Sequence, residues 1–378
     1  MFPEIDEHRV YLRDRSRLSA YERALTHVVT PTSIVVDYGA GTGILGMLAC
    51  RAGASHVYAI EQGGIAGLAR EIARANDLAA VLTVVRGNTR DVNLPARADV
   101  VVCDQIGAFG LDAGITDVAR EARVRFLRPG GVLVPHAIQL CAAAVERAEV
   151  HDRVAAWLDR VAGFDLSAAA PIARNTTFPV TLDARNLLTA AASSAPVDLL
   201  SDDVWPVEVR AETTATRGGV VHGIGGWFVA HLSAEVVMTN DPASADRICR
   251  RQLFLPIGDA VEVAAGAAIA LTVRMSSPDV ISWSATIDAR DGQRKVFRQS
   301  SVEGMLLSKE DVLRVAPGHR PRLSTLGAAR LTVLGLCDAS HSVDEIEKAV
   351  YLTHRDLFLS MEEASTFVAR ILGQDGAG

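Results

Sequence analysis

Short apolar runs alternate with stretches of helical spacing between residues 34 and 135. The runs are almost continuously apolar, which is typical of strands buried on both faces of a parallel sheet. Strands that alternate with helices predict a doubly wound, Rossmann-like α/β domain. The expected strands are SIVVDYG, HVYAIE, AVLTVVRG, ADVVVCD and RFLRPGGVLVP, and the expected helices are TGILGMLACRAGA and GIAGLAREIARANDL.

The pattern changes after Pro135, where strand-like runs alternate with Asp/Gly turns such as ARDGQR. The runs GWFVAHLSAEVVM and VISWSATID are rich in the aromatic and β-branched residues that favour strands. One helix is expected around HDRVAAWLDRVAG. This part of the chain is therefore predicted to be a largely antiparallel β-barrel or sandwich.

The end of the chain returns to helical spacing after a linker expected over residues 301–323. Two of its expected helices begin with the S-x-x-E spacing of a capping box, in which each side chain satisfies the other's free backbone N–H. These pairs are Ser342 with Glu345 and Ser360 with Glu363. The predicted domains are an N-terminal helix with the α/β domain over 1–135, the β domain over 136–306, and a small helical domain over 320–375.

Composition narrows the class of protein. The chain has 378 residues and a formal net charge of -7, so it offers no basic surface of the kind that binds nucleic acid. The five cysteines form no CxxC pair, which favours reduced thiols over a metal site or disulfides. The segment MFPEIDEHRV is acidic, and no apolar run has the length of a membrane span. We therefore expect a cytoplasmic protein with no metal and no membrane partner.

A glycine-rich loop follows the first expected strand in VVDYGAGTG. Asp37, Gly39 and Gly41 end the strand and lead into a helix, where glycines let a ligand approach the backbone and its free N–H groups. Glu61 ends the next strand, where a carboxylate can accept hydrogen bonds from both ribose hydroxyls. Ile44 stands where a dinucleotide fingerprint requires its third glycine. The loop therefore favours a nucleoside ligand without a pyrophosphate.

The stretch VVDYGAGTGILGMLACRAGASHVYAIE resembles motif I of class I S-adenosylmethionine (SAM) methyltransferases, and among them the protein arginine methyltransferases. The stretches HRVYLRDRSRLSAY, LRPGGVLVP and VAGFDLSAAA resemble three further segments of that family in the same order. The resemblance implies SAM as cofactor and S-adenosylhomocysteine as product, with Arg17 on the SAM carboxylate. It also implies a homodimer formed through a helical arm inserted after VAGFDLSAAA.

The adenine edge departs from the resembled family. Arg90 stands where the family has a glutamate that faces the adenine amino group. Asn88 or the Thr89 backbone is expected to meet the adenine instead.

The loop CDQIGAFGLD resembles the family's acidic loop, whose two glutamates hold the substrate guanidinium. Asp104 replaces the first glutamate and Ala113 the second, while Asp112 lies one position early. The family's T-H-W motif is also missing, and RICRRQLF stands in its place. A bidentate grip on a guanidinium demands tight geometry. Asp104, close to the cofactor, and Asp112 are thus the candidate catalytic residues, but arginine is not the expected acceptor.

Three kinds of acceptor remain open. An amine could be held by Asp104, which would also take up its proton. A carboxylate needs no base, but Asp104 would repel it unless a cation such as Arg250 or Arg251 intervened. A hydroxyl needs a base, for which Asp104, His222 and His231 are available.

The segments LSTLGAARLTVLGLCDASHSVDEIEKAV and EEASTFVARIL resemble the small winged-helix domain of the pyrroloquinoline-quinone peptide chaperone, with Ala339 in place of a glycine. That domain binds leader peptides in enzymes that modify ribosomal peptides. The resemblances together imply an enzyme that methylates N or O of a peptide or protein, with ribosomal peptide natural products among the candidates. The alternatives are a small-metabolite methyltransferase, whose helical tail only packs or dimerises, and a SAM-binding scaffold that has lost catalysis.

Overall fold

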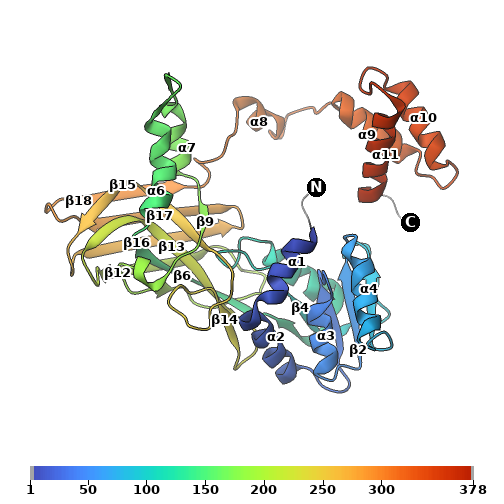
Figure 1. Ribbon diagram of the computed structural model, residues 1–378, viewed down its shortest axis with the longest axis horizontal. Helices are drawn as coiled ribbons and strands as arrows, with labels where there is room; N and C mark the ends of the chain where they lie inside the picture. The colour runs from blue at the N-terminus through green and yellow to red at the C-terminus, as the bar shows by residue number, and fades with distance from the viewer. Residues whose placement is uncertain (1–3, 376–378) are drawn as a thin grey trace. The chain divides into compact units, whose positions relative to one another are not determined.

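The computed structural model describes residues 4–375, so the first three residues of MFPEIDEHRV lie outside the described part. The chain forms two compact units, Met1–Met305 and Leu306–Gly378. The first unit contains a parallel sheet followed by antiparallel sheets, and the second is helical (Figure 1). No helix among the described residues is long and apolar enough to cross a membrane.

A five-stranded parallel sheet begins the first unit and confirms the predicted Rossmann-like domain. Its strand order is β3-β2-β1-β4-β5, and β1 and β4 are paired so that Tyr38 lies opposite Cys103. The strand order reverses at β1, and ligands of open α/β sheets gather at the carboxyl edge of such a switch point. The strands are β1 (Ile34–Tyr38), β2 (His56–Glu61), β3 (Leu82–Arg86), β4 (Ala98–Cys103) and β5 (Leu127–Val134).

Helices precede and separate these strands. They are α1 (Glu4–Arg13), α2 (Arg15–Val28), α3 (Ile44–Arg51), α4 (Ile65–Ala75) and α5 (Ile115–Glu121), with a π-helical turn at Ala122–Phe126. Asp14 separates α1 from α2 and caps α2 by accepting the N–H of Arg17 at 3.1 Å. Capping thus divides the N-terminal segment into two helices, where the resemblance implied one.

The antiparallel part forms two sheets that face each other over an apolar core. One sheet has the order β10-β6-β13-β15-β9, in which β11 also pairs with β6 and β14 with β13. The other sheet has the order β12-β16-β17-β18. Trp283 Nε1 donates to the Pro256 carbonyl at 2.6 Å and ties the sheets together. The strands are β6 (Ala137–Val145), β9 (Phe178–Val180), β10 (Ala192–Ser193), β11 (Val197–Asp198), β12 (Val207–Thr214), β13 (Gly219–His231), β14 (Val237–Thr239), β15 (Gln252–Val263), β16 (Ala268–Ser277), β17 (Val280–Asp288) and β18 (Arg294–Ser300).

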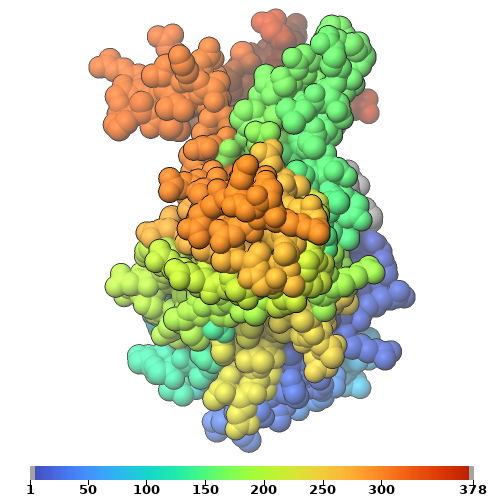
Figure 2. All heavy atoms as spheres, turned by 90° about the vertical axis from the view of Figure 1, so that its left-hand side faces the viewer, coloured from blue at the N-terminus to red at the C-terminus, as the bar shows by residue number. Residues whose placement is uncertain are grey.

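A helical projection stands out from the antiparallel sheets (green in Figure 2). It consists of α6 (Ala148–Ala155), α7 (Ala170–Arg174) and, between them, two 3₁₀ turns and the short pair β7 (Arg160–Val161) and β8 (Phe164–Asp165). The stretch VAGFDLSAAA thus forms part of the projection, whereas the sequence placed an arm after it. The expected helix around HDRVAAWLDRVAG also ends earlier, because its last residues turn into β7.

The second unit contains α8 (Lys309–Arg314), α9 (Thr325–Gly335), α10 (Val343–Thr353) and α11 (Met361–Asp375). Helix α8 lies within the expected linker, and Ser308 with Asp311 forms a capping box that the sequence analysis missed. The capping box of Ser342 and Glu345 is present. Ser360 accepts the Glu363 N–H at 3.2 Å, but Glu363 itself accepts from Leu359 rather than from Ser360.

Helices α9, α10 and α11 share a small apolar core of their own. The described residues of the second unit include no strand, and therefore no wing.

Candidate functional site

The glycine-rich loop leaves β1 in a conformation that favours glycine. Gly39, Gly41 and Gly43 have φ angles of +69°, +55° and +80°. A Cβ atom on Gly41 would lie 2.8 Å from Cε1 of His8, so helix α1 passes close over the loop. Another group can approach this backbone so closely only because these positions lack side chains.

Glu61 is fixed at the end of β2 by two backbone groups. Its Oε2 accepts the Gly41 N–H at 2.9 Å, and its Oε1 accepts the Gly63 N–H at 2.6 Å. A carboxylate has about four lone-pair sites, so each oxygen can still accept one further hydrogen bond. This geometry suits a vicinal pair of ribose hydroxyls.

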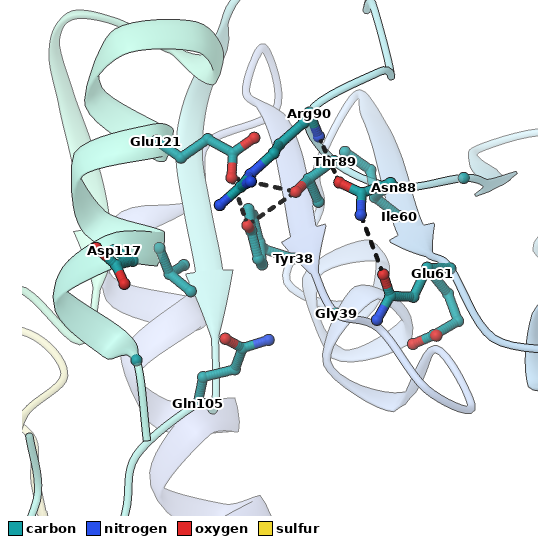
Figure 3. A pocket seen from close by; sticks show the side chains of 14 residues that line it. Tyr38, Gly39, Ile60, Glu61, Asn88, Thr89, Arg90, Gln105, Asp117 and Glu121 are labelled. Atoms are coloured by element: carbon teal, nitrogen blue, oxygen red, sulfur yellow. Dashed lines mark hydrogen bonds between the residues drawn. The ribbon is translucent and has the colours of Figure 1, made fainter. Parts of the chain in front are cut away.

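These groups border a cavity of about 400 Å³ at the carboxyl edge of the parallel sheet (Figure 3). Gly39 and Glu61 lie on one side, and Gln105 follows β4 on another. The residue types and the volume fit a nucleoside, such as the adenosine part of SAM. The remaining lining residues come mainly from β1, the loop after β3, and α5: Tyr38, Ile60, Gln62, Gly87, Asn88, Thr89, Arg90, Gly114, Asp117, Val118 and Glu121.

Asp37 supports the loop from beneath and does not line the cavity. Its Oδ2 accepts the Gly46 N–H of helix α3 at 2.7 Å, and its side chain is buried. Burial raises the pKa of Asp37 to about 7, although the Gly46 hydrogen bond opposes this shift. The structure therefore assigns this predicted cofactor residue an indirect, positioning role.

The loop after β3 brings Asn88, Thr89 and Arg90 to the cavity (Figure 3). The Asn88 side chain accepts the Arg90 N–H at 3.0 Å and donates to Gln62 at 3.3 Å. Thr89 Oγ1 lies 2.8 Å from the Tyr38 hydroxyl. Arg90, which stands at the position of the missing adenine-facing glutamate, thus belongs to a loop that these hydrogen bonds hold in place.

Glu121 brings a carboxylate to this side of the cavity that the sequence analysis missed. Its Oε2 accepts from the Tyr38 hydroxyl at 2.7 Å and from Thr89 at 3.2 Å, and its Oε1 accepts from Arg125 at 3.0 Å. Glu121 ends α5, sixty residues beyond Glu61, so only the tertiary fold brings it here.

Asp104 follows β4 and is bonded to two arginines. Its Oδ2 accepts from Arg17 Nε at 2.5 Å and from Arg250 Nη2 at 3.1 Å. Its Oδ1 accepts from Arg250 Nη1 at 3.3 Å and from the Tyr21 hydroxyl at 3.1 Å. Burial alone would raise the pKa of Asp104, but Arg250 and Arg17 outweigh it and hold the pKa below its ordinary value. Asp104 is therefore an ionised carboxylate within an arginine clamp.

Asp112 holds the acidic loop in shape. It accepts the Phe109 N–H at 2.9 Å, and a Cβ atom on Gly107 would overlap its carboxyl group. Burial raises its pKa against the opposing effect of these backbone N–H groups. Of the two candidate catalytic residues, Asp104 is thus paired with arginines, and Asp112 bonds within its own loop.

The segment RICRRQLF is held against the acidic loop and helix α2. Asp14 Oδ2 accepts the Cys249 N–H at 2.7 Å. Asn240 donates to the carbonyls of Ala108 and Arg251, both at 2.9 Å. These bonds fix the backbone on both sides of Arg250, which explains how a residue 146 positions after Asp104 reaches it.

The two candidate histidines lie elsewhere in the β domain. His222 Nδ1 accepts the Arg147 N–H at 3.1 Å, and His231 packs beside His136 with ring centroids 6.1 Å apart. Burial lowers the pKa of both. Neither residue lines the cavity. No group of three or more metal-ligating side chains occurs within residues 4–375.

Comparisons with known proteins agree with the division of the first unit into a Rossmann-like domain and an antiparallel β domain. Residues 136–285 match the arginine methyltransferase oligomerization subdomain, and residues 18–133 match the ribosomal protein L11 methyltransferase family. Protein arginine N-methyltransferase 1 of Schizosaccharomyces pombe is 32% identical over 236 residues, which cover 60% of this chain and 68% of that protein. The corresponding protein of Oryza sativa subsp. indica is 31% identical over 227 residues, and the match covers 58% of either chain.

Two solved structures share the fold. The arginine methyltransferase 1 enzyme–prozyme heterotetrameric complex of Trypanosoma brucei, determined with S-adenosylhomocysteine, has a TM-score of 0.68 at 22% identity, and the match covers 78% of this chain and 96% of that one. Arabidopsis thaliana protein arginine methyltransferase 10, in an open conformation, has a TM-score of 0.65 with the same identity and coverage.

Proposed function

Because the chain belongs to the protein arginine methyltransferase family, we propose that it is a SAM-dependent methyltransferase acting on a peptide or protein nucleophile. The observation that carries the proposal is the nucleoside-sized cavity bordered by Gly39 and by a Glu61 carboxylate with one free lone-pair site on each oxygen. When bound, SAM would supply an electrophilic methyl group on its sulfonium.

We assign the residues of the chain these roles. Gly39 and Gly41 allow close approach to the backbone, Glu61 accepts from the ribose, and Asn88 and Thr89 border the adenine. Arg17 uses only its Nε and Nη1 groups on protein acceptors in the described part of the chain, so its other N–H groups can hold the SAM carboxylate. Asp37 and Asp112 position the loops, and Asp104 orients the arginines.

Calorimetry with SAM and with S-adenosylhomocysteine tests the cofactor assignment. Both are expected to bind without added metal, and Glu61→Gln should weaken both, because the amide can offer only one accepting oxygen. Glu71→Gln is the matched control, since Glu71 lies exposed on helix α4 and pairs with Arg74. Absence of binding to the wild-type protein contradicts the proposal. Binding without any turnover to S-adenosylhomocysteine would instead favour a scaffold.

The projection is proposed to be the arm of a homodimer. It exposes four large apolar side chains, Trp157, Leu158, Val161 and Phe164, and 71% of Phe164 is accessible. Exposed apolar groups clustered on one projection mark a protein contact. Light scattering should give a dimer mass for the wild type and a monomer mass for Phe164→Ser. A monomeric wild type at micromolar concentration contradicts this part of the proposal.

The second unit is proposed to be a small helical element that recruits a peptide substrate. Its support is a separate apolar core together with exposed side chains such as Leu326, Leu331 and Leu352. Since the described residues there contain no strand, recruitment through an added strand is not expected, and the helix faces are the candidate surface.

Truncation after Met305 tests this role of the tail. SAM affinity should be unchanged, because every proposed SAM residue precedes it. Methylation of a long peptide should fall sharply, and methylation of a short mimic of its acceptor site should fall little. Equal loss on both peptides would mean that the tail supports the catalytic fold, and a small metabolite would then be the favoured substrate.

The five cysteines are all free, in keeping with the cytoplasmic location that we propose.

A further inference from the structure

The arginine clamp has no capacity to hold a substrate guanidinium in a bidentate manner. A carboxylate offers about four lone-pair sites, and Asp104 accepts three hydrogen bonds from arginines, two from Arg250 and one from Arg17. The Tyr21 hydroxyl lies 3.1 Å from Oδ1 of Asp104 and 2.9 Å from the Cys103 carbonyl, and its one proton can go to either acceptor. The Asp104 side chain is only 11% exposed. A guanidinium could therefore bind Asp104 in a bidentate manner only by displacing Arg250.

The same cluster has hydrogen-bond donors to spare. Arg250 donates through Nη1 to Asp104 and to the Ile106 carbonyl, the latter at 2.8 Å, and through Nη2 to Asp104. Of the five N–H groups of a guanidinium, two on Arg250 have no acceptor in the described part of the chain. The Arg250 side chain is 13% exposed and pairs with Asp104 at 3.1 Å. The available capacity is thus for an acceptor of hydrogen bonds.

Charge points the same way as hydrogen-bonding capacity. Two arginines against one aspartate leave the clamp with a net charge of +1. The SAM that we propose for the neighbouring cavity is itself a cation. An ammonium or guanidinium substrate would approach an excess of positive charge, whereas an anion would be attracted to it.

From these observations we propose that the methyl acceptor is a carboxylate of the substrate, held by the free N–H groups of Arg250. This inference rests on the proposed methyltransferase function and specifies its substrate class. A carboxylate oxygen attacks the methyl carbon and forms the C–O bond of a methyl ester. The carbon–sulfur bond breaks at the same time, and its electron pair stays on sulfur as a neutral thioether. No proton is transferred in the step.

The bonding of the candidate bases named from the sequence agrees with this chemistry. An amine or a hydroxyl must lose a proton during methylation. Arg250 and Arg17 hold the pKa of Asp104 below its ordinary value, and both of its oxygens accept from these arginines, so it is a poor proton acceptor. Asp112 bonds within its loop, and neither His222 nor His231 lines the cavity. A carboxylate is the acceptor that needs none of them.

Direct binding tests the acceptor class without requiring turnover. The probes are propionate and methylguanidinium, the side-chain ends of glutamate and arginine, observed by saturation-transfer NMR on the full chain with S-adenosylhomocysteine present. Propionate should give the stronger effect on the wild-type protein, and methylguanidinium should give none. Arg250→Lys, which keeps the charge but removes the planar fork, and Arg250→Gln should reduce the propionate effect at least fivefold. The matched control is Arg251→Gln, because Arg251 is adjacent and exposed, and it should bind as the wild type does.

Product chemistry provides the second arm. A synthetic random peptide library is incubated with the protein and methyl-labelled SAM, in parallel with the same library after amidation of its carboxylates and after acetylation of its amines. Label should require free carboxylates and should be released as methanol in mild base, as expected for an ester. Label that survives both amidation and base treatment overturns the inference while leaving the methyltransferase function intact.

The two arms separate the outcomes. If the library receives no label although SAM binds, the propionate comparison decides: preference for methylguanidinium, equal effects, or no propionate effect overturns the inference. If neither SAM nor its product binds the wild type, the proposed function has failed before the acceptor is in question.

Discussion

Gly41→Ala is the substitution whose effect on the proposed cofactor site can be worked out most fully. Gly41 has φ = +55°, in the left-handed region where an L-residue costs about 1–2 kcal/mol. Its new Cβ would lie 2.8 Å from His8 Cε1 and 3.1 Å from His8 Nδ1, whereas ordinary contacts begin at 3.4 Å. Either the ring or the loop must therefore move, and the loop carries the N–H that Glu61 accepts.

We expect the binding of S-adenosylhomocysteine to weaken at least tenfold, which corresponds to about 1.4 kcal/mol. Isothermal calorimetry gives the affinity, and urea unfolding gives the loss of stability. Gly53→Ala is the control: Gly53 has φ = +97° but no atom within 4 Å of the added Cβ, so it bears backbone strain alone. Gly53→Ala should lose stability through this strain and keep its affinity.

The clash can be separated from the backbone strain by a double-mutant cycle. If the His8 ring transmits the effect, His8→Ala combined with Gly41→Ala should recover part of the affinity lost by Gly41→Ala. Affinities of Gly41→Ala and Gly53→Ala that agree within twofold would refute the reasoning, because the loop would then tolerate a side chain at the ligand's approach.

Three further outcomes follow from the contacts described. The pKa of Asp37 is raised to about 7 in the folded state, so its contribution to stability is fully present below the unfolded-state pKa near 3.8 and is lost as pH rises through 7. Asp37→Asn should remove this fall in the free energy of unfolding, which is at most about 1.4 kcal/mol per pH unit; urea unfolding at pH 5 and pH 8 measures it. Asp112→Ala should lower turnover while the affinity for S-adenosylhomocysteine stays unchanged, and equal losses in both would contradict a role confined to the acidic loop. Ser342→Ala should destabilise the second unit by about 1 kcal/mol through loss of its cap, with hydrogen exchange in the first unit unaffected.

The parallel sheet and its carboxyl edge were predictable because they depend on local patterns. Continuous apolar runs fix the strands, glycines fix the turn after β1, and the position of Glu61 at a strand end fixes its side of the sheet. Each of these features lies within a few residues of the pattern that predicts it. The resemblance to a known family then added Arg17, which we propose as a residue of the same site.

The arginine clamp was not predictable in the same way. Arg250 was named only as one of two cations able to approach Asp104, because nothing local distinguishes it from Arg251. Hydrogen bonds to the backbone around Arg250 bring it, rather than Arg251, to Asp104. Asp14 accepts the Cys249 N–H, and Asn240 donates to the carbonyls of Ala108 and Arg251. Such contacts depend on how the β domain packs against helix α2, and spacing along the chain carries no record of that packing.

The clamp also bears on whether the altered acidic loop is a decayed site or a remodelled one. Loss of one partner from a buried ion pair leaves an uncompensated charge and costs about 3–5 kcal/mol, so a decaying site should contain buried polar atoms without partners. Both oxygens of Asp104 instead accept hydrogen bonds from arginines, and Arg250 is held by two acceptors. The buried side-chain atoms without partners among the described residues are Arg147 Nε, His151 Nε2, His231 Nε2 and Gln299 Oε1, none of which belongs to the clamp. Hydrogen bonds between charged groups from three distant segments, with none of the clamp's side-chain atoms buried without a partner, therefore favour a site rebuilt for another acceptor over one that has simply lost its function.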